Sequence, residues 1–272
     1  MWWGEFEERE DLGGGKAGGR RPVGLGEDHL GKIPLAAEHL VDPLLDGVGR
    51  EKPRHRDGAG EALQRPELKN LKKLGYKFDD PREVVDIFEK KVARFAGSEY
   101  AVSIDCCSHG VFLALKYLTR IHKLPVLSIS IPRHTYVSIP MQIEYANRRV
   151  IYDDRKWTGV YQLRDTRVWD GAVRWTKDMY VGGDALQVVS FQYKKRIPIG
   201  KGGMILTDDK LAYDTLKLMS YDGRDLSLPY DHPDHIKCFG YHMYCTPEDA
   251  ARGIMLMDNT PKVNEDSGDY TK

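Results

Sequence analysis

The stretch Ser190–Thr207 reads SFQYKKRIPIGKGGMILT, and it sets the fold that we expect for the whole chain. Leu186–Phe191 is typical of a buried strand, and Met204–Thr207 is typical of a second strand. Lys194 and Lys195 stand between them, followed by glycines. A lysine at the end of a buried strand can become a nucleophile toward a carbonyl carbon, because desolvation lowers its pKa. Taken alone, the lysines also suit a solvated turn, since most lysines lie at the surface.

Strands and helices alternate from Asp80 onward. Asp80-Pro81-Arg82-Glu83 is typical of a helix start, because an Asp cap, an early Pro and a Glu three residues later satisfy the first turn. That helix is expected to end at Gly97. Further strands are expected at Tyr100–Ile104, Val126–Ile131, Arg149–Tyr152 and Arg167–Trp169, with helices at Val111–Leu118 and Asp209–Met219. The alternation predicts a three-layer α/β/α fold around a mainly parallel sheet.

The composition separates the first 65 residues from the rest. Residues 1–60 hold thirteen of the 27 glycines, and no aromatic residue occurs from Glu7 to Gly75. Such a segment buries too little apolar surface to offset the conformational entropy lost on folding. We therefore expect a poorly ordered Gly/Arg-rich extension over residues 1–65, a folded domain over 66–258 and a polar tail over 259–272.

Charge and spacing argue against several classes of protein. The 41 Lys and Arg balance 41 Asp and Glu, which disfavours general binding to nucleic acid or to anionic membranes. The sequence contains no run of about 18 apolar residues, so it predicts no membrane span. The cysteines and histidines lack the spacing typical of metal ligands, so no metal is expected. Adjacent Cys106 and Cys107 would strain a mutual disulfide, and a reducing cytoplasm is the simplest setting.

Three further positions follow or end expected strands. Asp170 closes a short apolar strand, where α/β sheets bind ligands, although it also suits an ordinary turn. Cys107 and Ser108 open a helix whose free N–H groups can hold a phosphate, although vicinal cysteines are also common as small buried side chains. Tyr136 follows another strand and, by itself, suits the core equally well.

The order and spacing of these motifs resemble the DegT/DnrJ/EryC1/StrS family of sugar aminotransferases, which are pyridoxal-phosphate enzymes. The resemblance runs from Phe88 to Gly253 and is most specific over Ser190–Thr207. It implies the large domain of the aspartate-aminotransferase fold, bound pyridoxal 5'-phosphate and a homodimer. The implied reaction moves an amino group from an amino acid, namely glutamate, to a nucleotide-linked keto-sugar, as in polysaccharide biosynthesis.

 

The resemblance also assigns roles to single residues. Lys195 is similar to the lysine that bonds the cofactor, with Lys194, one position earlier, as the alternative. Asp170 is similar to the carboxylate that keeps the pyridine nitrogen protonated. Tyr136 is similar to the aromatic side chain that stacks on the cofactor ring. The remaining cofactor contacts that the resemblance implies are Cys107, Ser108 and Ser190 at the phosphate, and His242 where relatives carry an Asn.

The chain departs from the family's pattern at three points. His242 either donates to the phosphate of a neighbouring subunit, as the family's Asn does, or is structural. The interval from Tyr136 to Lys195 is short by about one strand–helix unit, and few residues follow Gly253, so we expect the C-terminal small domain to be missing. Two alternatives to an active enzyme therefore stay open: a catalytically inactive remnant of the fold, and a nucleotide-sugar-binding or assembly protein.

Overall fold

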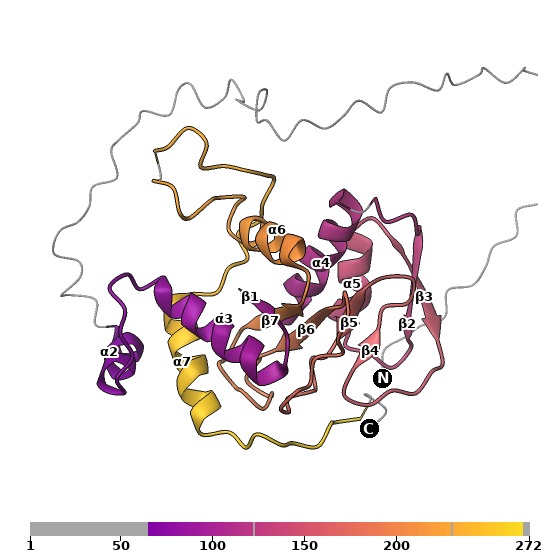
Figure 1. Cartoon of the computed structure of the whole chain (residues 1–272). Helices are drawn as coiled ribbons and strands as arrows, with labels where there is room; N and C mark the ends of the chain where they lie inside the picture. Colours follow the sequence, from indigo (N-terminus) through magenta and orange to yellow (C-terminus); the bar gives the residue numbers. More distant parts are fainter. Residues whose placement is uncertain (1–64, 122, 230, 269–272) are drawn as a thin grey trace, which may run out of the picture. The chain divides into compact units, whose positions relative to one another are not determined.

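The computed structural model describes residues 65–121, 123–229 and 231–268. The extension expected over residues 1–65 lies outside the described residues, apart from Arg65. The helices are α2 Pro66–Lys73, α3 Glu83–Ala96, α4 Cys107–Ile121, α5 Ser138–Tyr145, α6 Lys210–Ser220 and α7 Pro247–Asp258 (Figure 1). The strands are β1 Tyr100–Ile104, β2 Ser128–Pro132, β3 Arg149–Asp153, β4 Tyr161–Gln162, β5 Val168–Asp170, β6 Leu186–Ser190 and β7 Gly203–Thr207.

The larger sheet has five strands in the order β1-β7-β6-β5-β4. Strands β5 and β6 are parallel, whereas β7 is antiparallel to both β1 and β6, and β4 is antiparallel to β5. The α/β class is confirmed, but the sheet is mixed instead of mainly parallel. One reason is the turn between β4 and β5, residues 163–167, which is too short for the crossover that parallel neighbours require. The other is the position of β7 between β1 and β6, where it pairs antiparallel with both strands.

Strands β2 and β3 form a separate parallel pair, with Ile129 opposite Val150. The segment from 146 to 190 contains no helix, so the chain passes from β3 through the short β4 directly to β5. The N–H of Arg164 donates to the carbonyl of Ser130 at 3.0 Å and links this pair to the segment that follows β4. The absence of a helix in this interval agrees with the short spacing noted in the sequence.

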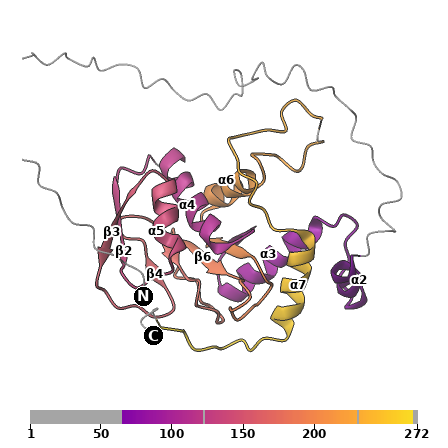
Figure 2. The same cartoon turned by 180° about the vertical axis from the view of Figure 1, so that it is seen from behind.

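The five-stranded sheet separates two apolar cores. Ala101, Met204 and Val189 point to one side, where they pack with residues of α2, α3 and α7. Val102 and Ile205, next to them in the strands, point to the other side and pack with residues of α4, α5 and α6. Figure 2 shows α3 and α7 together on one side and α4 and α5 together on the other. The three-layer α/β/α architecture is therefore confirmed.

The end of α3 follows the signal in its sequence, but its start does not. The helix begins at Glu83, with Arg82 at the N-cap position and no side-chain cap hydrogen bond, so the expected cap at Asp80 is wrong and Asp80 lies in the turn before the helix. The Asp80 N–H donates to Glu83 Oε1 at 3.0 Å, while the Asp80 carboxylate accepts from the N–H of Arg82 at 2.8 Å. Gly97 closes the helix with a φ of 81°, in the left-handed region that glycine adopts without strain. The helix is thereby held at the edge of the sheet, beside β1.

The segment that follows α7 packs along the domain. Asp266 forms a bidentate ion pair with Arg174, and the Gly159 N–H donates to the carbonyl of Ser267 at 2.9 Å. Asn264 donates to the carbonyl of Trp175 at 2.8 Å. The described part of the polar tail expected over residues 259–272 is therefore bound to the region between β4 and β6. Within the described residues, no helix combines the length and the apolar character that a membrane span needs.

Candidate functional site

Asp170 is a buried carboxylate at the end of β5, with 4 % of its surface exposed. Its Oδ1 accepts from the N–H of Ala172 at 2.9 Å, and its Oδ2 accepts from the Tyr161 hydroxyl at 2.7 Å. Burial raises the pKa of Asp170, while these two hydrogen bonds and the charge of Lys195 act in the opposite direction. Among the described residues, no Lys or Arg forms an ion pair with Asp170, so its charge is held mainly by neutral donors.

Tyr161 connects Asp170 to the segment that follows β2. The Tyr161 side chain is 3 % exposed, and its hydroxyl also forms a hydrogen bond with the Thr135 hydroxyl. Since a tyrosine has one hydroxyl hydrogen, which it gives to Asp170, Thr135 is the donor in the second bond. The ring of Trp157 packs against that of Tyr161, with 4.7 Å between their centroids. Three separate segments thus meet at one carboxylate.

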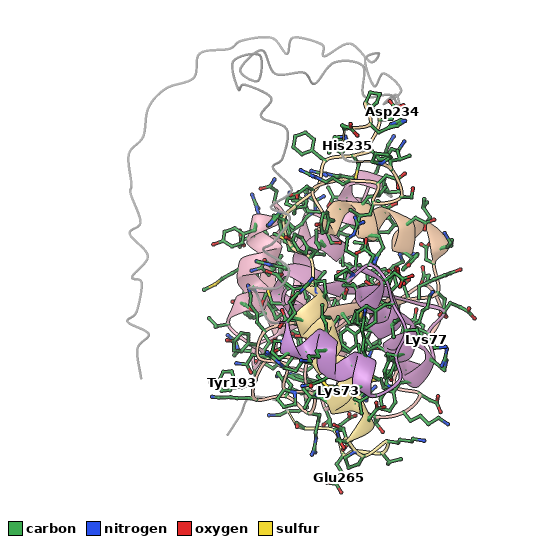
Figure 3. All side chains as sticks on the ribbon, turned by 90° about the vertical axis from the view of Figure 1, so that its left-hand side faces the viewer. Lys73, Lys77, Tyr193, Asp234, His235 and Glu265 are labelled. Carbon is green, nitrogen blue, oxygen red and sulfur yellow. The ribbon has the colours of Figure 1, made fainter. Side chains whose placement is uncertain are left out.

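The structure distinguishes the two lysines of the glycine-rich turn. Lys195 is half-buried, and its charge lowers the pKa of both Asp170 and Cys107. Lys194 is exposed, with its ammonium 5.5 Å from the centroid of the Tyr193 ring. Tyr193 lies at the periphery of the molecule in Figure 3. Of the two lysines, Lys195 is therefore the one whose charge acts on the buried carboxylate, whereas Lys194 is exposed to solvent.

The first turn of α4 lies against the start of β7. A Cβ atom added at Gly203 would come within 2.6 Å of the Cys107 nitrogen and 2.8 Å of the Cys106 carbonyl carbon, so only glycine allows this approach. The Ser108 and Ser138 hydroxyls lie 2.6 Å apart and join the starts of α4 and α5. The first N–H groups of a helix have no partner within it, and they suit an anion. The junction therefore has the chemistry of a phosphate site.

A charged cluster borders this junction. Asp105 receives a hydrogen bond from His109 Nδ1 at 2.7 Å and from Lys201 Nζ at 3.1 Å. The bond to Asp105, with a smaller contribution from Cys106, raises the pKa of His109 to about 10. Asp105, Cys106 and His109 offer possible metal-ligand atoms within 4.8 Å of one another. The ion pairs with His109 and Lys201 already balance the Asp105 charge, so the cluster needs no metal to explain its geometry.

The remaining candidates from the sequence lie around the buried carboxylate or apart from it. Ser190 ends β6 opposite Gly203, and its hydroxyl accepts weakly from the N–H of Gln192 at 3.4 Å. Tyr136 is 51 % exposed and follows Thr135 directly. His242 is exposed and lies 2.9 Å from Asp222, away from the contacts that define the Asp170 cluster. Asp170 and Ser190 thus end neighbouring parallel strands, and the start of α4 lies against Gly203 opposite Ser190. Tyr136 follows the separate β2–β3 pair, and His242 lies apart.

Sequence reasoning missed Tyr161 and Ser138 as parts of this site. Thr135 belongs to the Thr-Tyr motif that contains Tyr136, but the sequence assigned it no role of its own. Tyr161 belongs to a strand of only two residues, which is too short to show a period. Ser138 opens α5, and that helix was not expected. A usable signal was nevertheless present, because a polar side chain next to a strand end is a recurrent position for ligand binding in α/β folds.

A second polar cluster lies between α3 and β1, on the other side of the sheet from α4. Glu89 is 3 % exposed and accepts from the N–H and hydroxyl of Ser103, both at 2.8 Å, while its other oxygen pairs with Lys217 at 2.8 Å. A cavity of about 680 Å³ opens beside it, lined mainly by α3, α6 and residues 221–227. Asp170 and Lys195 do not line this cavity, so the two clusters are distinct.

Residues 172–267 match the model of the DegT/DnrJ/EryC1/StrS aminotransferase family. The matched segment starts just after Asp170 and contains Ser190, Lys195 and the glycine-rich turn. The resemblance expected from these motifs is confirmed. No curated protein matches the sequence.

Solved structures of this family's kind share the fold. A sugar aminotransferase from Micromonospora echinospora is 18 % identical with a TM-score of 0.56, covering 71 % of this chain and 64 % of its own. An aminotransferase of Helicobacter pylori involved in pseudoaminic acid biosynthesis is 14 % identical with a TM-score of 0.55, covering 72 % and 63 %. The E. coli GDP-4-keto-6-deoxy-D-mannose-3-dehydratase with bound hydrated PLP is 17 % identical with a TM-score of 0.53, covering 72 % and 66 %. The chain therefore spans less than two thirds of the length of these proteins.

Proposed function

We propose that this chain is a pyridoxal-phosphate-dependent sugar aminotransferase. The observation that carries the proposal is the buried Asp170 carboxylate at the end of β5, on which the charge of Lys195 acts. The first turn of α4, whose free N–H groups suit an anion, supports it. The family match over residues 172–267 supports the same class of reaction. In the proposed reaction, an amino group passes from glutamate to a nucleotide-linked keto-sugar. We further propose that the enzyme works as a homodimer in the cytoplasm.

The residues of the site fit this cofactor. Pyridoxal phosphate, when bound, supplies the electron sink for chemistry at an amino-bearing carbon. Asp170 would hold a proton at the ring nitrogen, and the N–H groups at Cys107 and Ser108 would bind the phosphate. Tyr136 would cover the ring, and Ser190 would make a further phosphate contact. The ends of neighbouring strands β5 and β6, where Asp170 and Ser190 lie, support this arrangement, and the burial of Asp170 excludes water from its carboxylate.

Lys195 has two tasks in this proposal. Its Nζ would bond the cofactor covalently before substrate arrives, and the released amine would then move a proton to or from the substrate carbon. A lysine at this position also favours an aminotransferase over a dehydratase, since family members that act as dehydratases carry His there. The His242 side chain, exposed on its own chain, would serve as a phosphate donor to a neighbouring subunit.

The first test measures cofactor attachment in the full chain. After incubation with pyridoxal phosphate, the protein should gain visible absorbance, and borohydride should fix the label on the peptide that contains Lys195. Lys195→Ala should abolish the labelling. Lys194→Ala is the matched control, because it removes the exposed lysine of the same turn and should leave the labelling unchanged. Labelling that survives Lys195→Ala would contradict the assignment.

The second test measures amino transfer. The protein loaded with pyridoxal phosphate, and not treated with borohydride, should convert glutamate to 2-oxoglutarate and then aminate a nucleotide-linked keto-sugar from a panel. A protein that binds the cofactor but transfers nothing would be the inactive remnant of the fold. A protein that binds a nucleotide-sugar without taking up the cofactor would instead be a binding or assembly protein. Light scattering with and without the cofactor would decide whether the active species is a dimer.

A further inference from the structure

The hydrogen bonds around Asp170 form a directed chain. Thr135 donates to Tyr161, Tyr161 donates to Asp170 Oδ2, and the Ala172 N–H donates to Oδ1. Thr135 follows β2, Tyr161 lies in β4 and Asp170 ends β5, so packing of three segments sets the geometry. Tyr161 and Asp170 are both nearly inaccessible to water, which leaves these donors as the main replacement for hydration.

We propose that Tyr161, held in place by Thr135, is a positioning residue that keeps Asp170 as a carboxylate ready for a cationic ring nitrogen. The identity of that ligand rests on the proposed function, whereas the effect of Tyr161 on Asp170 does not. A neutral donor suits this task better than a cation. An adjacent lysine or arginine would also stabilise the carboxylate, but its charge would compete with the protonated ring nitrogen.

The carboxylate retains the capacity for that extra partner. Each carboxylate oxygen accepts about two hydrogen bonds, and Oδ1 and Oδ2 of Asp170 each have one protein donor. Glu89, also buried, differs because Lys217 already neutralises it. The pattern around Asp170 is therefore what a buried carboxylate needs if its counter-charge arrives with a ligand.

The first experiment uses the full chain without cofactor. Carbon-13 NMR of labelled aspartate, assigned with Asp170→Asn, would follow the titration of Asp170. Tyr161→Phe removes the hydroxyl and should raise the pKa of Asp170 by about one pH unit or more, because a hydrogen bond to a charged group is lost. Tyr180→Phe is the matched control, since the Tyr180 hydroxyl bonds the carbonyl of Ala185 instead of a carboxylate. An unchanged Asp170 titration in Tyr161→Phe would overturn the proposal.

A second pair of variants covers the case in which Tyr161→Phe does not fold. Thr135→Val removes the hydroxyl that supports Tyr161 and keeps the side-chain shape, whereas Thr135→Ser keeps the hydroxyl. The valine variant should shift the Asp170 titration in the same direction by a smaller amount, and the serine variant should titrate as the unmodified chain does. Equal titrations of the two variants would contradict the role of Thr135.

The third measurement uses the cofactor itself. In Tyr161→Phe, pyridoxal phosphate should bind about tenfold more weakly, and the pH dependence of its visible absorbance should shift. If the unmodified chain binds no cofactor, the proposed function fails, while the Asp170 titration still tests the effect of Tyr161. If the unmodified chain binds and the variant shows the same pH dependence, only the present inference fails.

Discussion

Glu89 on α3 and Asp170 at the end of β5 are both carboxylates with less than 5 % of their surface exposed, yet their surroundings differ. Glu89 receives two hydrogen bonds from Ser103 and an ion pair from Lys217. Asp170 receives two neutral hydrogen bonds, and the nearest cation that acts on it, Lys195, forms no ion pair with it. Burial of an unpaired charge is costly, whereas a paired one is tolerated.

This difference separates a structural carboxylate from a candidate functional one. Glu89 has its counter-charge inside the protein, so nothing further is needed to stabilise it. Asp170 has donors that hold its orientation but lacks an adjacent cation among the described residues. A buried group whose pKa is displaced by desolvation is a candidate for function, because that arrangement lowers the stability of the folded protein.

Removing the charge of Glu89 should give the largest effect on stability. Glu89→Gln leaves Lys217 with only the exposed Asp86 carboxylate, 3.3 Å from its Nζ. We expect a loss of about 2 kcal/mol, which is less than for a fully broken buried pair because Asp86 remains and Lys217 is 26 % exposed. Urea unfolding would measure the loss. Asp214→Asn on the exposed Lys210–Asp214 pair is the control, and it should cost less than about 0.5 kcal/mol. Equal losses in the two variants would remove the basis of the comparison.

Removing the charge of Asp170 should affect stability in the opposite direction. Burial raises the folded-state pKa of Asp170, so its contribution to stability is full below the ordinary pKa and is lost as pH rises through the folded value. Asp170→Asn removes that penalty, and at pH 7 we expect stability to be unchanged or higher by about 1 kcal/mol. Cofactor uptake should nevertheless be lost. A destabilisation as large as that of Glu89→Gln would show that Asp170 is structural as well.

The half-exposed pair of Asp105 and His109 should give the smallest effect. Because the folded-state pKa of His109 is raised to about 10, the stabilisation is present below its ordinary pKa of 6.5 and is lost as pH rises toward that folded value. After allowance for solvent screening, we expect His109→Gln to cost about 1 kcal/mol at pH 6 and nearly nothing at pH 10. Unfolding at the two pH values measures this, and a cost independent of pH would exclude the ion pair as its source.

Much of the fold could be predicted from local patterns. The glycine that ends α3 with a positive φ, and the strands that end near Asp170 and Ser190, depend on near neighbours in the sequence. Local patterns also placed both lysines of the turn between β6 and β7. They could not distinguish Lys194 from Lys195, because that choice depends on which charge acts on Asp170.

The sequence by itself therefore determined the α/β class, the two strands that flank the glycine-rich turn within Ser190–Thr207 and the residue types available for chemistry. The tertiary structure decided the mixed sheet, the action of the Lys195 charge on Asp170 and the contact of Tyr161 with Thr135, which lies 26 residues away. It also brought together Glu89 and Lys217, which are 128 residues apart. The physical reason is that hydrophobic periodicity and turn chemistry act between near neighbours, whereas the partner of a buried polar group is chosen by the packing of distant segments.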